Sequence, residues 1–271
     1  MKHRVIIRRC ETYDPDRIGA IIQGGMRELG AKPAGRVALK PNTVIAHPEF
    51  FPHAFTRSEF LDGALAATRA EAGQMEELAV TERCGITVPT RFAFSMAGYM
   101  PVMRRHRAVA HYMDESRSVL VELKKEGRLR DHIYVPEPMV RTDYLINLPK
   151  LKAHPWTTMT ASLKNYIGIQ DDRHRLVDHN TWLEHKIVDL QEVIRSDFIA
   201  VDAITAGQHM MLTPTPFSLG AIVMGDNSCA VDTVCAHMIH VDPRKVHHLR
   251  MASERGYGPL DLADIQLVRD Y

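Results

Sequence analysis

Short apolar runs alternate along this chain with longer stretches that carry apolar residues at helical spacing. Val5–Ile7 is the first such run, and Ile18 and Ile22 recur behind it four residues apart. Runs of this kind predict buried strands, whereas the longer spacing predicts helices that pack on a sheet. Asp14 before Pro15 is a typical helix start and places the first helix after the first strand.

The same pattern predicts the remaining elements. Strands are expected at residues 37–39, 78–80, near 109, 119–121, 133–135, 144–148, 198–201, 219–224 and 265–268. Helices are expected after a Thr56–Glu59 capping box and at residues 91–99, from 157, at 183–194, 228–238 and 243–255. Residues 170–180 are predicted to be a loop, and 207–216 a lid-like loop. Alternating strands and helices indicate an α/β fold, a mostly parallel sheet with helices on both faces. We predict one domain over residues 1–271, and any division into two lobes around a cleft is expected near residue 145.

Composition narrows the class of protein. Of 271 residues, 45% are hydrophobic and 25% charged, as in globular proteins, and 34 basic against 33 acidic residues leave a net charge of +1. This balance does not favour nucleic acid or an anionic membrane as partner. No apolar run approaches the ~20 residues of a membrane span, and the N-terminus lacks the features of a signal peptide.

The four cysteines are Cys10, Cys84, Cys229 and Cys235, and none shows CxxC spacing. We therefore expect no iron–sulfur cluster or structural zinc held by this chain. Reduced thiols favour a cytoplasmic location.

The stretch Asn147–Asn165, NLPKLKAHPWTTMTASLKN, concentrates ionisable groups at one place. Pro149 ends the strand predicted at 144–148, and Lys150, Lys152 and His154 follow within five residues. Such a strand end would deliver three cationic or ionisable side chains to one point.

A helix is predicted to begin at Thr157, with Thr157, Thr160 and Lys164 on one stripe. Unpaired N–H groups at a helix start attract negative charge, and neighbouring lysines add to the attraction. The stretch therefore indicates an anion site; the alternative is an ordinary solvated basic loop.

Other predicted strands also end in polar residues. In open parallel sheets, ligands bind outside the carboxyl ends of the strands. By this rule the following groups should converge on one edge with the central stretch: Lys40 and Asn42, Glu82 and Arg83, Asp202, and Asp226. Each also has a purely structural interpretation. Lys40 and Glu82 suit an ordinary ion pair, Asp202 a turn, and Asp226 a turn or helix cap.

A second cluster of histidines follows the central stretch. His174 and His179 lie in the predicted loop, near several aspartates, and His154 would be able to join them as a metal ligand. The spacing is not the i, i+4 pair of a helical zinc site. A histidine-rich loop that orders over substrate is the competing interpretation.

Four segments together resemble the family called domain of unknown function 362. They are LKPN from Leu39, the central NLPKLKAHPWTTMTASLKN, VDAI from Val201 and GDNSCAVDTV from Gly225, in order between Val5 and Gly258. The resemblance implies an α/β fold, a prokaryotic soluble protein and a frequent link to iron–sulfur clusters, whose cysteine motif this chain lacks. The residues carried over are Lys40, Asn42, Asn147, Lys150, Lys152, His154, Thr157, Thr160, Lys164, Asn165, Asp202, Asp226 and Asp232.

Three functions remain open from the sequence. The first is an enzyme acting on a small anionic metabolite, a carboxylate or a phosphate, in a redox or proton-transfer step. His154, Lys152 and Asp202 would be catalytic, and Lys40, Asn42, Asn147, Lys150, Thr157, Thr160, Lys164, Asn165 and Asp226 would bind substrate. The second is a metal-dependent enzyme that uses histidines and a carboxylate. The third is a non-catalytic accessory protein that works with an iron–sulfur redox partner, and a homo-oligomer is compatible with all three.

Overall fold

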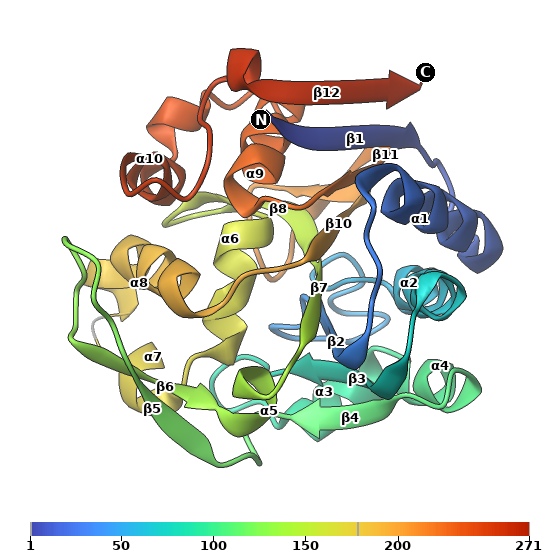
Figure 1. The fold of residues 1–271 in the computed structure, drawn as a ribbon, viewed down its shortest axis with the longest axis horizontal. Helices are drawn as coiled ribbons and strands as arrows, with labels where there is room; N and C mark the ends of the chain where they lie inside the picture. The colour runs from blue at the N-terminus through green and yellow to red at the C-terminus, as the bar shows by residue number, and fades with distance from the viewer. Residues whose placement is uncertain (1, 178, 271) are drawn as a thin grey trace.

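The computed structural model describes residues 2–177 and 179–270 and shows helices on both faces of one large sheet (Figure 1). Its described strands are β1 (His3–Arg9), β2 (Gly35–Pro41), β3 (Met75–Glu82), β4 (Val109–Tyr112), β5 (Ser118–Glu122), β6 (His132–Pro136), β7 (Tyr144–Leu148), β8 (Lys150–His154), β9 (Thr158–Thr160), β10 (Phe198–Gln208), β11 (Thr215–Gly225) and β12 (Ile265–Asp270).

The helices connect these strands in an alternating order. The α-helices described are α1 (Pro15–Leu29), α2 (Ser58–Glu71), α3 (Thr90–Met96), α4 (Tyr99–Arg105), α5 (Glu137–Val140), α6 (Ser162–Asn165), α7 (Asp172–Arg175), α8 (His179–Val193), α9 (Ser228–Met238) and α10 (His247–Glu254). Short 3-10 turns are η1 (Tyr166–Ile169), η2 (Pro243–Lys245) and η3 (Leu262–Asp264). In the described part of the chain, no helix combines the length and the apolar character that crossing a bilayer requires.

The main sheet has the strand order β12-β1-β11-β10-β7-β2-β3-β4 among the described residues, with β8 joined to β10 and β9 to β8. Adjacent strands from β10 through β7, β2 and β3 to β4 run parallel, as do β1 and β12. β11 is antiparallel to both of its neighbours, β1 and β10. The predicted mostly parallel α/β sheet is therefore confirmed. The predicted strands at residues 119–121 and 133–135 form β5 and β6, which pair antiparallel outside this sheet as a separate two-stranded sheet.

Apolar side chains that point alternately to the two faces of the strands form one hydrophobic core on each face of the sheet. In β1, Val5 and Ile7 join the cluster that packs with α8, α9 and α10, whereas Ile6 joins the cluster that packs with α1 and α2. Figure 1 shows the first group of helices on the left of the sheet and α1, α2 and α4 on the right. Successive side chains of a strand point to opposite faces, so an apolar run is buried on both sides. One domain over the whole chain, or two lobes, stays a prediction.

Helix α1 begins and ends as its sequence predicts. The Asp14 side chain accepts hydrogen bonds from the backbone of Asp16 and Arg17, and Pro15 takes the first helical position. Gly30 closes the helix in the left-handed region at φ 70°, where glycine has no Cβ to strain. Local chemistry is sufficient to set both ends of this helix.

Several predicted local features are wrong. No capping box forms before α2, because the Thr56 hydroxyl donates to the carbonyl of Leu148 instead. Gly98, at φ 75°, divides the helix predicted at 91–99 into α3 and α4. The strand predicted to end near Asp202 continues to Gln208, and the loop predicted at 170–180 contains α7.

The central stretch also differs from its prediction. Pro149 does not end the sheet there, since β8 follows at once and pairs with β10. Thr157 starts no helix: the chain reverses at Thr158, φ 66°, and returns as β9, with Lys152 opposite Thr160. The pairing of β8 with two neighbours satisfies backbone groups that a surface loop would leave to water, and this tertiary pairing overrides the helical spacing.

Asp232, buried inside α9, holds the start of α6 in place. Its two carboxylate oxygens accept from the backbone N–H groups of Ser162 and Leu163, at 2.7 and 3.0 Å. Burial raises the pKa of Asp232 to about 7, and the two hydrogen bonds oppose that rise. The side chain therefore braces the segment that carries Lys164 and Asn165.

Replacing Asp232 by Ala should lower the free energy of unfolding by about 1–3 kcal/mol, because two buried N–H groups lose their acceptor. Chemical denaturation at pH 8 measures the change. Asp226→Ala, at an exposed aspartate just before α9, is the matched control and should change stability by less than about 0.5 kcal/mol. Equal stability of the two variants would contradict the bracing role.

Candidate functional site

A small cavity opens at the carboxyl edge of the parallel strands. It measures about 30 Å³, room for about one or two water molecules. Strands β3, β8 and β9, helices α6 and α7, and the connecting loops line it. The lining residues are Asn42, Val44, Glu82, Arg83, Lys152, His154, Thr160, Lys164, Asn165, Ile167, Gly168, Arg175 and Met211. Six of the predicted site residues therefore meet here.

Lys40 and Glu82 form a fully buried ion pair beside this cavity. The Lys40 Nζ lies 2.8 Å from Glu82 Oε1, and the exposed fractions of the two side chains are 0% and 2%. Glu82 also accepts from the backbone of Arg83 and Thr43, at 2.9 and 3.0 Å. Burial lowers the pKa of Lys40, and Glu82 opposes that change. The pair joins β2 to β3 where both strands end.

Gly168 is required by close packing on this pair. A Cβ at position 168 would lie 2.2 Å from Glu82 Oε1 and 3.1 Å from Lys40 Nζ. No side chain fits at that distance, so η1 can approach the ion pair only with glycine there.

Three asparagine side chains connect the strand ends below the cavity. Asn165 donates to Asn147 Oδ1 at 2.7 Å and accepts from Asn42 Nδ2 at 3.1 Å. Asn147 donates in turn to the carbonyl and hydroxyl of Ser162, at 3.1 and 2.9 Å. Asn147 is therefore a buried link behind the site, while Asn42 and Asn165 line the cavity itself.

Lys152 and Lys164 are the two lysines that face the cavity without a carboxylate partner among the described residues. Lys152 is buried and donates to the carbonyl of Ala54. Burial lowers its pKa well below the usual value, and the charges of Lys164 and Lys150 add to the effect. Burial, followed by the charge of Arg175, lowers the pKa of Lys164 to about 7. Lys164 thus titrates near neutral pH.

Two arginines add to the positive charge. Arg175, from α7, is buried, and burial lowers its pKa while Glu82 opposes the shift. Arg83 pairs with Asp172 at 2.7 Å. Glu82 is the single carboxylate that lines the cavity, against four lysine and arginine side chains of the described residues. The lining of the cavity therefore contains more basic than acidic side chains.

His154 lines the cavity from the end of β8. Its Nδ1 lies 3.2 Å from the backbone nitrogens of both Trp156 and Thr157, which donate to it. An acceptor role for Nδ1 places the proton of the neutral ring on Nε2. The turn after β8 thus fixes the orientation and tautomer of this histidine.

Lys150 and Asp202 form a second buried ion pair, at 3.0 Å, with no exposed side-chain surface on either residue. Tyr13 donates to Asp202 Oδ1 at 2.8 Å and accepts from Lys150 at 2.7 Å. Lys150 precedes Lys152 by two positions of β8, so this pair adjoins the cavity. It does not line the cavity, and its charges are internally balanced.

Two other predicted site residues do not face the cavity. Thr157 is buried and its hydroxyl donates to the carbonyl of Met159, which stabilises the turn before β9. Asp226 lies at the opposite edge of the sheet, because β11 is antiparallel and its end lies beside the start of β1. There Asp226 is half exposed and 3.8 Å from His3. The expected convergence of Asp226 with the lysines is wrong.

The predicted metal site receives no support from geometry. In the described part of the chain, no group of three or more His, Cys, Asp or Glu side chains is arranged to hold a metal ion. The His174 ring contacts His132 and Tyr134, with centroid distances of 5.5 and 5.3 Å. The side chain of His179 lies outside the described residues, so a metal role for His174 with His179 stays a prediction.

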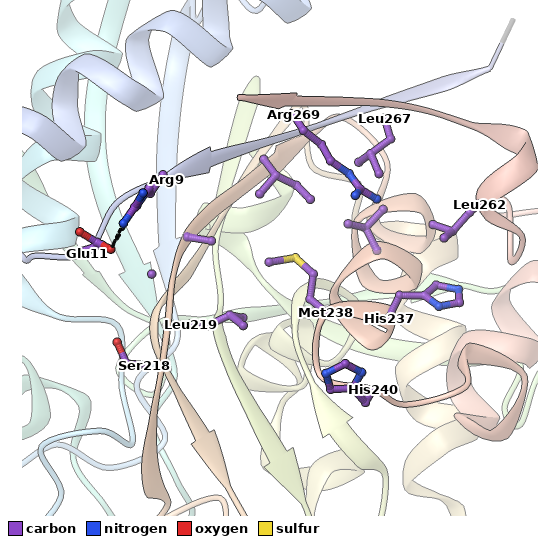
Figure 2. Close-up of a pocket in the computed structure, with 14 residues that line it drawn as sticks. Arg9, Glu11, Ser218, Leu219, His237, Met238, His240, Leu262, Leu267 and Arg269 are labelled. Atoms are coloured by element: carbon purple, nitrogen blue, oxygen red, sulfur yellow. Dashed lines mark hydrogen bonds and ion pairs between the residues drawn. The ribbon is translucent and has the colours of Figure 1, made fainter. Parts of the chain in front are cut away.

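A larger cavity, of about 520 Å³, lies elsewhere, between β1, β11, β12 and α9 (Figure 2). Its walls are formed largely by apolar side chains such as Leu219, Met238 and Leu267. Arg9 and Glu11 at its margin pair with each other at 2.6 Å. None of the predicted site residues reaches this cavity, and volume alone does not identify a reactive site.

The comparison with protein families gives a clear match. A model described as "Domain of unknown function (DUF362)" matches residues 37–237. The chain belongs to this family. The matched segment contains both buried ion pairs and every residue that lines the small cavity.

Individual proteins similar to this DUF362 chain are distant. The "Thylakoid-associated protein sll1697" of Synechocystis sp. is 24% identical over 272 residues, covering 96% of this chain and 81% of that protein. The lactate racemase apoprotein of Thermoanaerobacterium thermosaccharolyticum aligns with a TM-score of 0.43 and 11% identity. That alignment covers 80% of this chain, which spans about half (53%) of the racemase chain.

Sequence analysis missed several residues of this DUF362 site, among them Arg175, Met211 and Tyr13. Arg175 lines the cavity from the end of α7 and Met211 from the loop between β10 and β11, and neither segment carries a motif. Tyr13 follows β1, which runs parallel to β10 because both are antiparallel to β11. The strand-end rule applied to β1 would have identified Tyr13.

Glu82→Gln should lower the free energy of unfolding by about 3 kcal/mol at pH 7, since it leaves the Lys40 charge buried without its partner. The difference in unfolding free energy between the variant and the wild type should become smaller as pH rises. Without Glu82 the folded protein releases the Lys40 proton at a lower pH than the unfolded chain does, so stability increases with pH. Urea unfolding between pH 7 and 9.5 measures both effects.

Glu77→Gln is the control on the same strand. Glu77 is partly exposed and 3.3 Å from His111. Removing its charge should lower the free energy of unfolding by less than about 0.5 kcal/mol. A Glu82→Gln variant as stable as Glu77→Gln would show that the buried pair does not hold β2 and β3 together.

Proposed function

We propose that this chain is an enzyme that binds a small anionic metabolite, a carboxylate or phosphate, in the cavity at the carboxyl edge of the sheet. The observation that carries the proposal is that Lys152 and Lys164 line the same small cavity without a carboxylate partner among the described residues. Lys152 is buried and Lys164 partly buried, and an anion bound between them would offset the cost of holding their charges away from water. Asn42, Asn165 and Thr160 supply neutral hydrogen-bonding groups around the same space.

The cavity admits only the charged end of such a metabolite. A volume of about 30 Å³ suits one or two waters, which a carboxylate or phosphate oxygen would replace. Arg175 would contribute a fixed charge, because guanidinium groups stay protonated where lysines titrate. Binding would raise the pKa of both lysines, since a nearby anion favours their charged form.

Proton transfer is the step that these residues are suited to perform. Lys164 has a pKa of about 7, and a group that titrates near the working pH is the most effective general acid or base. His154 is oriented with its proton on Nε2 and lies on the wall of the same cavity. We assign His154 and Lys164 as the acid–base pair and Lys152 as the main anion ligand. The buried Lys150–Asp202 pair is a positioning element for β8.

Inorganic sulfate is a suitable probe, because its charge does not change between pH 6 and 8. Its affinity should fall roughly tenfold from pH 6 to pH 8, as the single Lys164 proton is lost across a pKa of about 7. Isothermal titration calorimetry at low ionic strength measures the affinity. Lys164→Arg should show a smaller decrease in sulfate affinity between pH 6 and pH 8 than the wild type, since arginine keeps its charge and only Lys152 is left to lose a proton.

Lys164→Met should bind sulfate more weakly at pH 6 and show a smaller decrease toward pH 8 than the wild type. Lys124→Met, at an exposed lysine after the β5 strand, is the control and should behave as the wild type. Sulfate binding by Lys164→Met with wild-type affinity and pH dependence would refute the assignment of Lys164 to the anion site.

A further inference from the structure

The loops that supply or adjoin the residues lining the cavity also expose apolar side chains on the surface. Among the described residues, twelve large apolar side chains are substantially exposed, and six of them belong to these loops. We call the six the apolar rim: Phe50, Ile86, Trp156, Leu176, Val177 and Met210. Isolated exposed apolar residues are ordinary, but a concentration around one mouth indicates a binding surface.

One ring contact and three sequence neighbours connect the apolar rim to the residues that line the cavity. The Trp156 ring lies 5.7 Å from the His154 ring between centroids, edge to face, and remains 50% exposed. Met210, 51% exposed, precedes Met211, which lines the cavity. Leu176 and Val177 follow Arg175, another lining residue.

Two further loops complete the apolar rim. Phe50 lies in the loop between β2 and α2, and Ile86 in the loop between β3 and α3. A hydrogen bond connects the two loops: the backbone N–H of Gly85 donates to the carbonyl of Val44 at 2.6 Å. Val44 itself lines the cavity. The loops that supply polar groups to the cavity therefore also supply its apolar surroundings.

The small size of the cavity indicates which part of a ligand the apolar rim would contact. The cavity measures only about 30 Å³, so any ligand larger than its charged end must extend outside, onto the mouth. A wholly polar ligand would gain nothing from exposed Trp156 and Met210, whereas an apolar chain or ring would bury them. Methionine and tryptophan are well suited to irregular apolar ligands, since one adapts its shape and the other offers a large flat face.

We propose that the ligand of the cavity is amphipathic: a carboxylate or phosphate whose apolar portion lies along the apolar rim, mainly on Trp156 and Met210. This inference rests on the proposed function, because it assumes that the cavity binds the anionic end. It adds the substrate class, and it assigns Trp156 as a specificity-determining residue.

A homologous series of n-alkanesulfonates tests the inference, because the charged group stays constant while the chain grows. Calorimetry at pH 6 compares methane-, butane-, hexane- and octanesulfonate. Affinity should rise roughly two- to fourfold per added methylene, the upper value corresponding to complete burial of each group. Trp156→Ala should weaken octanesulfonate binding at least fivefold and leave methanesulfonate unchanged, since the backbone N–H that orients His154 is retained.

Val140→Ala is the control for loss of an exposed apolar side chain. Val140 is 52% exposed and ends α5, which precedes the start of β7 at the opposite edge of the sheet. This variant should bind the whole series as the wild type does.

A second readout uses the two tryptophans of the chain. In a Trp182→Phe background the emission of Trp156 should shift to shorter wavelength with octanesulfonate but not with methanesulfonate.

The outcomes separate the two proposals. Binding of inorganic sulfate with no gain along the alkyl series would overturn the amphipathic ligand and leave the anion site standing. No binding of sulfate or any sulfonate would overturn both. Equal weakening of methane- and octanesulfonate by Trp156→Ala would place Trp156 in the anion site instead. Sedimentation of the protein with uncharged phosphatidylcholine vesicles, abolished by Trp156→Ala, would make the apolar rim a membrane-docking surface and also refute the inference.

Discussion

The site depends on one carboxylate, Glu82, placed among buried cations. Both of its oxygens are engaged, one by Lys40 and the backbone of Arg83 and the other by the backbone of Thr43. It therefore fixes the ends of β2 and β3 and one connecting loop at the same time. It also offsets the charge of Lys40, and its field extends to Lys152 and Arg175, where it opposes the lowering of their pKa values by burial. Among the described residues, Lys152 and Lys164 line this edge without a carboxylate of their own within ion-pair distance.

The sequence predicts the scaffold of this edge because strand ends follow simple rules. Apolar runs identify the parallel strands, and the polar residues that end them, Lys40, Asn42 and Glu82, do converge. The same rule is wrong for Asp226 because it assumes that every strand runs the same way. β11 returns antiparallel after a loop of only a few residues, and nothing in its apolar run distinguishes the two directions.

Local patterns fail where tertiary pairing decides the structure. Thr157, Thr160 and Lys164 have helical spacing, yet β9 forms because Lys152 and Thr160 pair across two short strands. A three-residue strand has no recognisable sequence pattern and is stable only when it pairs with another strand. Arg175 is unpredictable for a related reason, since its burial depends on where α7 packs. The sequence therefore predicts the lining residues that lie at strand ends, but not those that lie in loops or short helices.

The small volume of the cavity and the near-neutral pKa of Lys164 have the same physical origin. A wider opening would admit bulk water, which would solvate the lysines and return their pKa values toward those of exposed side chains. Tight packing, including the close approach of Gly168 to Glu82, limits the access of water to the partly buried Lys164 and makes its proton easier to release. An anionic group that enters would displace the few remaining waters and stabilise the protonated lysine. Under the proposed function, exclusion of water would prepare the site both to attract an anion and to exchange a proton with it, and the exposed apolar loop residues would maintain that exclusion once a ligand is bound.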